Sequence, residues 1–586
     1  MCVLLGCGTA DDESGSDAGS GGSSGMAVED STDGGDHDDD DDDTDGGEES
    51  GDSSDDSDGG SDDTGSPTCE EGEVMAACAC GGTAVDMGYC CGDVWFEPAY
   101  ETLTGGCPAA PFFYVDPDHE GASDDNPGTT DAPWATLRHA VDTLTAGQTV
   151  IVAGTTYTGQ PVDSRYEPVF NPANSGTPGA PIVIKGVDAP IVTTVPTLTA
   201  SVAAASADTV TFDESVSSES GAYEGFFVRI TDGNSMDEYL RIAAYDGPSR
   251  TATVQRPWDA VPEASASLSL TTPGPLIGTN GRQHVVWDGF HVVERDSYHP
   301  DTGPVVGWAS QDVAFLGNEI EGQAVTLIDN HNGLRIEGSE RIWVRNNEIH
   351  GQQPIDTGAN NPQNHASVMI YTSSDCVVEH NELHDTYSAF FPKGGDSGHV
   401  FRFNEVHDAA KAFRVSYHAS VDIYQNVIYA CEIGLQPAEE NADVRFFNNV
   451  VYDCATGVNN WFPTEGFSVF NNLFVQTSAP FHFEAAPGNL DVDYNGYFGM
   501  EDFVVNNGNV GGLSGWQRLG YDPNAVEADP QFVDAANLDF RLEPGSPVEA
   551  AGVDWGDVDA DGDVTEAVPL GAYVGADSTI GRFGPQ

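Results

Sequence analysis

The chain has 586 residues and a formal net charge of −76 at pH 7, because it holds 96 Asp and Glu residues against 20 Lys and Arg residues. This charge excludes nucleic acid as a partner, since nucleic-acid phosphates require a basic surface. The sequence also excludes a membrane span, because no segment reaches the run of about eighteen apolar residues that a transmembrane helix needs.

Residues 1–7 end in Leu4-Leu5-Gly6-Cys7, which resembles a bacterial lipobox. The resemblance implies that Cys7 is lipidated and becomes the mature N-terminus, so that a lipid anchor is the only contact with a membrane. The apolar run before Cys7 is too short for a signal peptide and has no basic region ahead of it, so we expect the true start further upstream. A chance match is the alternative.

Residues 8–66 consist mainly of Asp, Ser, Gly and Glu, contain no Lys or Arg, and hold 23 of the 96 acidic residues. Such a segment cannot bury enough apolar surface to offset the loss of chain entropy, and its charges repel one another. We therefore predict a disordered, extended acidic tether, which suits a surface lipoprotein.

Residues 67–111 contain six cysteines in a Gly-rich stretch. In an exported chain this density predicts a small disulfide-stapled module, with 15 possible pairings that the sequence leaves open. A zinc site is the alternative, although the spacings lack paired Cys-x-x-Cys motifs. The six residues are Cys69, Cys78, Cys80, Cys90, Cys91 and Cys107.

Residues 112–190 begin with apolar residues at helical spacing, which predict a helix within 133–146 that caps the open end of a solenoid. These apolar residues are Trp134, Leu137, Ala140, Val141 and Leu144. Strands are expected at 149–153 and 182–185. Residues 191–272 contain stretches in which apolar and polar residues alternate, and they lack the Asn-containing repeat described below. We therefore predict a small inserted β module there.

One short phrase recurs between Phe315 and Tyr497: an apolar residue, two residues of any kind, an Asn, one more residue and an apolar residue. Five of the seven intervals between these Asn are 22 or 23 residues, and the two longer intervals leave room for protruding loops. This period predicts a solenoid of short strands stacked about 4.8 Å apart. The eight Asn are Asn318, Asn347, Asn381, Asn404, Asn426, Asn449, Asn472 and Asn495.

The positions three residues before and two residues after each Asn in the regular coils are apolar, so they must face one continuous core. Each Asn would lie at a bend, where its side chain can bond its own backbone and the Asn of the next coil. We therefore give these Asn a structural role. The coils are expected to cover 273–500, and residues 501–586 to close the C-terminal end.

A strand that begins eight residues after each Asn is predicted to carry polar and aromatic side chains on its outer face. Such planar rings and multidentate polar groups suit sugar rings, hydroxyls and carboxylates. The expected substrate-binding residues are Arg335, Glu337, Tyr371, Gln436, Asn459, Trp461 and His482.

The coils, together with the segments Tyr114–Gly159 and Asp529–Gly552, resemble secreted right-handed parallel β-helix proteins of the pectate lyase-like superfamily. These two segments are similar to the usual opening and the usual close of such helices. The resemblance covers most of residues 112–575. It implies an all-β, right-handed parallel β-helix and a place outside the cell or on its surface, while activity stays open because folds host many functions.

Lysine is rare, and the chain has only Lys185, Lys393 and Lys411. Lys393 precedes Arg414 by 21 residues, close to one coil, so we expect the two side chains near each other on neighbouring strands of one face. A β-eliminating polysaccharide lyase needs a base, an acid and positive charge for a uronate carboxylate. A Lys whose pKa is lowered by an adjacent Arg can be the base, with Arg414 holding the substrate or protonating the leaving group.

The spacing of this pair resembles that of the Lys and Arg in β-helix lyases of the chondroitinase-B and alginate-lyase type. Those lyases carry acidic calcium ligands shortly before the Lys. Here Thr386, Tyr387 and Ser388 stand at those positions. Calcium-assisted catalysis of that type is therefore not expected at this site.

Near the C-terminus, four Asp alternate with other residues around Gly562, with the oxygen-ligand spacing of a calcium loop. The usual Glu at the twelfth position is missing, because Val568 stands there. We predict a structural calcium ion, with a solvated acidic turn as the alternative. The four ligands would be Asp557, Asp559, Asp561 and Asp563.

The sequence thus supports two functions. The first is a polysaccharide lyase, expected to be monomeric, that cleaves uronate-containing glycans with Lys393 and Arg414. The second is a non-catalytic surface lipoprotein that binds glycans through the same face. Glycoside hydrolysis is a further enzymatic option, which needs two carboxylates about 5–10 Å apart; Glu439, Glu440 and Glu465 are its candidates.

Overall fold

The structure is a computed structural model. It describes residues 74–80, 83–91, 94–159, 166–194, 198–236, 238–271, 274–294, 301–323, 330–354, 364–395, 397–417, 420–438, 442–460, 465–484, 490–554, 567–574 and 580–582. Several predictions from the sequence lie outside these residues, namely those for Cys7, Cys69, the tether, Trp461 and the acidic loop at 557–563. The side chains of Cys78 and Cys80 are also outside the described part.

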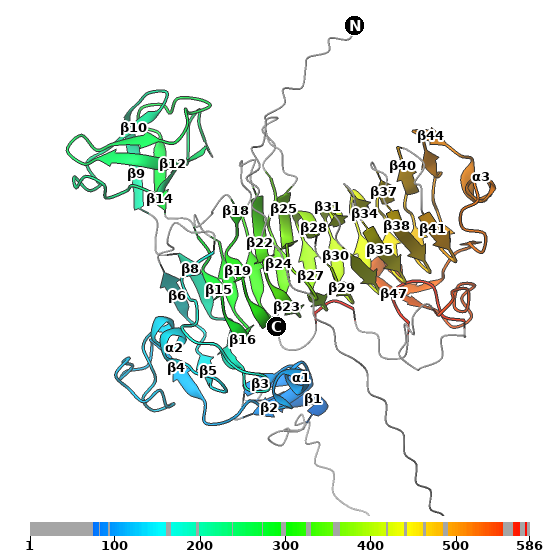
Figure 1. Ribbon diagram of the computed structural model, residues 1–586, viewed down its shortest axis with the longest axis horizontal. Helices are drawn as coiled ribbons and strands as arrows, with labels where there is room; N and C mark the ends of the chain where they lie inside the picture. The colour runs from blue at the N-terminus through cyan, green and yellow to red at the C-terminus, as the bar shows by residue number, and fades with distance from the viewer. Residues whose placement is uncertain are drawn as a thin grey trace, which may run out of the picture. The chain divides into compact units, whose positions relative to one another are not determined.

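Most of the described chain forms a solenoid of three long, almost entirely parallel sheets, in which successive coils add one strand to each sheet (Figure 1). Sheet I contains β15 (Ile277–Asn280), β19 (Val305–Trp308), β22 (Asn330–Glu337), β25 (His365–Tyr371), β28 (Thr386–Lys393), β31 (Ala409–Val415), β34 (Ile433–Pro437), β37 (Thr456–Asn460), β40 (Ala479–Phe483), β43 (Val504–Val505) and β44 (Gly508–Asn509), with β18 (Asp301–Thr302) beside β22.

Sheets II and III complete each coil. Sheet II contains β4 (Phe113–Val115), β5 (Thr149–Val152), β7 (Ile182–Gly186), β16 (Gln283–Asp288), β20 (Gln311–Leu316), β23 (Glu340–Arg345), β26 (Val377–Glu379), β29 (His399–Arg402), β32 (Val421–Tyr424), β35 (Ala442–Phe447), β38 (Glu465–Phe470) and β41 (Leu490–Asp493). Sheet III contains β6 (Thr156–Gly159), β8 (Ile191–Thr194), β17 (His291–Val293), β21 (Glu319–Glu321), β24 (Glu348–His350), β27 (Glu382–His384), β30 (Glu405–His407), β33 (Val427–Tyr429), β36 (Val450–Tyr452), β39 (Leu473–Val475), β42 (Gly496–Phe498) and β45 (Val526–Glu527).

The recurring Asn form a continuous ladder at the corner between sheets II and III. From Asn347 onward, the Oδ1 atom of each Asn accepts hydrogen bonds from the backbone N and the Nδ2 of the Asn one coil earlier, all at 2.9–3.1 Å. Asp522 ends the ladder by accepting from Asn495 at 3.2 and 3.1 Å. All eight Asn are buried, so these bonds satisfy polar groups that water does not reach.

The apolar columns on either side of the ladder point inward, as predicted. Phe315, Val344 and Ile423 belong to one buried core with Ile320 and Ile428. Because each coil repeats the same inward positions, every added coil extends the core without a break. The solenoid is therefore held by apolar burial inside and by the Asn ladder at one corner.

Helices close both ends of the solenoid. Helix α2 (Leu137–Thr143) lies within the predicted range and buries Leu137, Ala140 and Val141, while the hydroxyl of Thr136 accepts from the backbone N of His139 at 3.0 Å. At the other end, helix α3 (Gly512–Arg518) places Trp516 against Phe481 and Phe503, each at 5.0 Å between ring centroids. These caps cover apolar ends that stacking leaves exposed.

The inserted β module is a closed barrel with a core of its own. Its strands are β9 (Leu198–Ala205), β10 (Thr209–Phe212), β11 (Phe227–Ile230), β12 (Tyr239–Asp246), β13 (Thr251–Val254) and β14 (Ser267–Thr271). The expected boundary at residue 191 was wrong, because Ile191–Thr194 pairs with β6 and β17 of sheet III. This strand lacks the recurring Asn phrase by which the coils were recognised.

The Cys-rich region forms a sheet of β1 (Val74–Cys80), β2 (Thr83–Cys91) and β3 (Val94–Phe96), followed by helix α1 (Tyr100–Thr104). A disulfide joins Cys91 to Cys107, and Cys90 is also disulfide-bonded. Phe96 and Tyr100 pack on outward residues of sheet II. The region is thus a covering for the first coils.

The remaining C-terminal segment covers part of sheet III. It contains the short 3-10 helix η2 (Ala535–Asn537) between β46 (Phe532–Asp534) and β47 (Asp539–Leu542). Phe540 and Leu570 pack with Val450 and Leu473 of sheet III. No helix in the described part of the chain is long and apolar enough to cross a membrane.

Candidate functional site

The outward side chains of sheet I form two rows, which the register of the parallel strands defines. Row A consists of Arg335, Met369, Phe391, Arg414, Gln436, Asn459 and His482. Row B consists of Trp308, Glu337, Tyr371, Lys393 and Ser416. The two rows unite the described members of the predicted substrate-binding set on one face.

The two rows differ in exposure. Row A points away from the core, yet Arg335, Arg414, Gln436 and Asn459 are buried, and His482 is half-buried. In row B, Trp308, Tyr371 and Lys393 are half-buried. Glu337 and Ser416 of row B are buried, so a ligand can approach this row at Trp308, Tyr371 and Lys393.

A hydrogen-bond network fixes the first part of the face. Arg335 Nε donates to Glu337 Oε2 at 2.7 Å, and Arg335 Nη1 donates to Asn332 Oδ1 at 3.2 Å. Asn332 in turn donates to the backbone oxygen of Asn364, whose side-chain oxygen accepts from Lys393 Nζ at 2.8 Å. Glu337 is thus engaged with a buried arginine and is poorly placed to act as a free general acid.

Lys393 and Arg414 lie on neighbouring strands, and the ring of Phe391 lies beside both of them. Arg414 Cζ is 4.4 Å and Lys393 Nζ is 5.2 Å from the centroid of that ring. Lys393 Nζ also lies 5.5 Å from the ring centroid of Tyr371. The ring of Phe391 therefore presents an apolar platform flanked by two cations.

A third cation, Lys411, belongs to the same part of the face. Its Nζ donates to the phenol oxygen of Tyr387 at 2.7 Å and lies 4.0 Å from the centroid of that ring. Burial, together with the nearby Arg414 guanidinium, lowers the pKa of Lys411 to about 8, while Glu432 opposes this shift. Burial also raises the pKa of the Tyr387 phenol.

The sequence did not predict a role for Lys411, because it stands three residues before Arg414 and strict alternation puts such a pair on opposite faces. The strands of sheet I do not alternate strictly, since Ala366 and Met369, also three residues apart, pack together with Phe391. Lys411 pairs with Ser388 of β28. Its rarity as one of three lysines, 18 residues after Lys393, was the only available signal.

Among the Ser, Gln and Asn side chains of this face, four polar atoms are shielded from solvent and make no hydrogen bond within the described part of the chain. They are Ser388 Oγ, Ser416 Oγ, Gln436 Nε2 and Asn459 Oδ1. A buried polar atom without a partner costs about 1–3 kcal/mol. A hydroxyl-rich ligand or ordered water would supply the missing hydrogen-bond partners.

Among the residues that the structure describes, no three His, Cys, Asp or Glu side chains on this face lie close enough together to bind a metal ion. The two groups with suitable spacing, His291 with Glu319 and Glu321, and Glu319 with Glu348 and His350, belong to sheet III. The side chain of Glu465 and residues 439–440 lie outside the described part, so hydrolysis by those carboxylates stays a prediction.

Residues 305–474 match a family model described as a right-handed β-helix region. The match covers the coils that carry row B and all of row A except His482. With the parallel sheets described above, it confirms the predicted right-handed parallel β-helix. A search of curated proteins found no match.

Several solved structures are similar to this chain. A complex of XylC with xylose is 11% identical over 81% of this chain and 99% of its own, with a TM-score of 0.44. The pectate lyase Pel9A is 12% identical over 82% and 100%, with a TM-score of 0.43. A family GH136 lacto-N-biosidase from Eubacterium ramulus is 9% identical over 71% and 67%, with a TM-score of 0.36.

Proposed function

We propose that this β-helix protein binds a uronate-containing polysaccharide on the outer face of sheet I and cleaves it by β-elimination. The observation that carries the proposal is the constellation of Lys411, Tyr387 and Arg414 on neighbouring strands. It offers a base, a proton donor and a fixed positive charge within one small region. The sequence had assigned the base to Lys393, and we now assign it to Lys411.

Charge supports an anionic substrate. The chain holds 96 acidic and only 20 basic residues, and two of its three lysines are on this face. Lys393, Lys411 and Arg414 surround Phe391 and Tyr387. Three cations held beside aromatic rings in so acidic a chain create a local attraction for carboxylates, and the rings suit the apolar faces of sugars.

In the proposed reaction, Arg414 binds the uronate carboxylate and stabilises the negative charge that develops on it. The neutral amine of Lys411 removes the proton from the carbon next to that carboxylate. The electron pair of the broken C–H bond forms a carbon–carbon double bond, and the bond to the glycosidic oxygen breaks. Tyr387 donates its phenol proton to that oxygen, and the raised pKa of Tyr387 keeps this proton available at neutral pH.

Lys393 has a different part in this proposal. Its Nζ is held by Asn364 Oδ1 at 2.8 Å and is half-buried beside Tyr371. It would bind the carboxylate of a neighbouring sugar unit and hold the chain across row B. Loss of Lys393 would therefore weaken substrate binding more than it slows the chemical step.

The test is the ultraviolet absorbance of unsaturated products while the full chain is incubated with a panel of uronate polysaccharides. We expect absorbance to rise with at least one of them and to stay flat for Lys411→Ala. Arg445→Ala is the matched control, since it removes an exposed cation from sheet II that pairs with Asp422. A flat trace for the unmodified chain with every substrate would reject elimination.

A non-catalytic glycan-binding protein is the second candidate. The burial of Lys411 and Arg414 favours it, because a base that a substrate cannot reach does no chemistry. Binding on a glycan array without any product would identify this function. In either case the disulfide between Cys91 and Cys107 favours an oxidising compartment outside the cytosol. We propose that Cys7 anchors the chain to a surface. We also propose that residues 557–563 bind a structural calcium ion.

A further inference from the structure

The outer face of sheet III carries two adjacent columns of ionisable residues, far from rows A and B in the fold. The first column holds His291, Glu319, Glu348, Glu382 and Glu405, and the second holds Glu321, His350, His384, His407 and Tyr429. Stacked rings at 4.8–4.9 Å between centroids order the second column from His350 to Tyr429.

In the later coils, each carboxylate of the first column is matched by one ring donor of the next coil. His384 Nε2 lies 3.3 Å from Glu348, His407 Nε2 lies 3.5 Å from Glu382, and Tyr429 donates to Glu405 at 2.8 Å. With a ring donor for each of these carboxylates, and with Arg582 as a second partner of Glu348, these residues form a structural ion-pair ladder.

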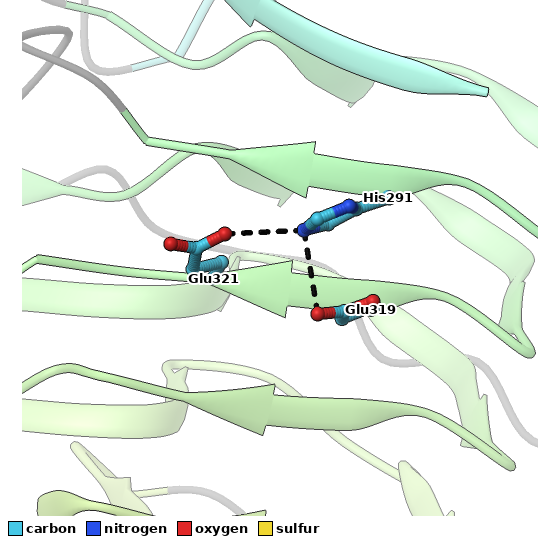
Figure 2. A group of neighbouring side chains, drawn as sticks. All are labelled: His291, Glu319 and Glu321. Atoms are coloured by element: carbon cyan, nitrogen blue, oxygen red, sulfur yellow. Dashed lines mark hydrogen bonds and ion pairs between the residues drawn. The ribbon is translucent and has the colours of Figure 1, made fainter. Parts of the chain in front are cut away.

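The first coils break this rule, as Figure 2 shows. Strand β21 contributes two carboxylates, Glu319 and Glu321, and the imidazole of His291 from β17 lies between them. His291 Nε2 is 3.3 Å from Glu319 Oε1 and 3.2 Å from Glu321 Oε2. His350 Nε2, from the opposite side, is 3.6 Å from the same oxygen of Glu319.

Hydrogen bonds alone do not satisfy all the polar atoms of this arrangement. An imidazole Nε2 carries at most one hydrogen, yet two carboxylate oxygens approach that of His291 at almost equal distances. The Nε2 of His350 is shielded from solvent and makes no hydrogen bond to any residue that the structure describes. In the second column, Glu321 stands at the position that a histidine occupies in each of the next three coils. It therefore adds a carboxylate without adding an imidazole. A shared cation accounts for all three features.

We propose that His291, Glu319 and Glu321 bind a divalent transition-metal ion such as zinc, and that Glu348 and His350 extend the site through the shared Glu319. Ligand atoms held tetrahedrally at about 2.0–2.1 Å from zinc lie about 3.3–3.4 Å from one another. The His291 Nε2 lies 3.3 and 3.2 Å from the oxygens of Glu319 and Glu321, close to this spacing, and the three ligand atoms all lie within 4.8 Å of one another. The side chains of His291, Glu319 and Glu321 are 21–41% exposed, so an ion can reach these three ligands.

The donor set also selects the class of ion. Imidazole nitrogen suits zinc, nickel, cobalt or copper, whereas calcium and magnesium prefer sites made of oxygen ligands. Three protein ligands leave at least one coordination position for water or for a ligand. The site is separate from the proposed lyase centre, and its existence does not depend on that function.

The experiment is a zinc titration of the chelator-stripped full chain in competition with a chromophoric chelator. We expect Glu319→Gln to weaken zinc binding at least tenfold and His291→Ala to do the same. Glu405→Gln is the matched control, since it removes the same charge from the same column, and we expect it to bind zinc like the unmodified chain. Zinc should raise the thermal midpoint of the control but not that of Glu319→Gln.

Equal zinc affinity in Glu319→Gln and Glu405→Gln would overturn the proposal, because zinc would then be held by the acidic segments elsewhere. Cobalt offers a second readout that does not depend on the stability of a variant. The unmodified chain should give the visible bands of ordered nitrogen and oxygen ligation, without an intense thiolate charge-transfer band. Absence of the visible bands, or presence of the thiolate band, would also overturn it.

Discussion

The Nζ atom of Lys411 donates a 2.7 Å hydrogen bond to the phenol oxygen of Tyr387 and lies 4.0 Å from the centroid of that ring. The ring favours the charged amine, whereas burial and Arg414 disfavour it. Burial and the like charge of Arg414 lower the pKa of Lys411 to about 8, against the opposing effect of Glu432. A lysine in this state can exchange a proton near neutral pH, which an exposed lysine does not do.

Replacement of Lys411 tests its assignment as the base. If the full chain eliminates a uronate polysaccharide, Lys411→Ala should lower kcat by roughly 10²–10⁴-fold, the usual contribution of a general base. Lys393→Ala should instead raise KM several-fold, because Lys393 is assigned to binding. Steady-state ultraviolet assays separate the two, and a larger kcat loss in Lys393→Ala would return the base to that residue.

The pH dependence of the reaction gives a second test. Lys411 acts as a base only when neutral, so kcat/KM should rise with pH and level off above the lowered pKa of about 8. At pH 6 the charged form would dominate and activity should be near its minimum. Rates measured from pH 5.5 to 9.5 check this, and an activity that falls as pH rises from 6 to 8 would contradict it.

The Asn ladder should contribute strongly to stability. Asn426→Ala removes the hydrogen bond to Asn449 Oδ1 at 3.0 Å and those from Asn404 at 3.0 and 2.9 Å, and it leaves the buried backbone N of Asn404 without its acceptor. We expect a loss of roughly 3–5 kcal/mol in the free energy of unfolding. Chemical denaturation measures this, with Asn537→Ala, an exposed residue bonded to Asp534, as the control expected to lose less than about 1 kcal/mol.

Asp522 occupies the end of the ladder, and burial raises its pKa to about 7. A raised pKa means that the folded state disfavours the carboxylate, so this residue costs stability that grows as pH rises from about 4 to about 7 and is then constant. Asp522→Asn keeps an amide in register with Asn495 and removes the buried charge. We expect it to raise the free energy of unfolding by about 1–3 kcal/mol at pH 8 and by much less at pH 4.

Denaturation curves at the two pH values test this prediction. Asp539→Asn is the control, because its partner Arg541 lowers the pKa of Asp539, so the change should remove a small stabilising contribution. A gain for Asp522→Asn that is equal at pH 4 and pH 8 would show that the charge is not the cause.

The solenoid was predictable because its physical cause is periodic in the sequence. A residue such as Ile423 or Ile428 recurs one coil later at a fixed interval, and stacking at the strand spacing turns that interval into neighbours. The Asn ladder followed from the same count, whereas the capping helix followed from apolar residues at helical spacing. The register of Lys393 beside Ser416, and of Phe391 beside Arg414, could likewise be counted from the Asn of each coil.

The coil, its core and the face on which a site would lie therefore follow from the residues alone. The tertiary structure alone decided which side chains on that face meet. Lys411 reaches Tyr387 because the strand departs from strict alternation, and His291 meets Glu319 and Glu321 because both carboxylates of one coil approach an imidazole of another. Local bends of a strand and the reach of individual side chains do not repeat at a fixed interval. They therefore cannot be predicted by counting residues along the chain.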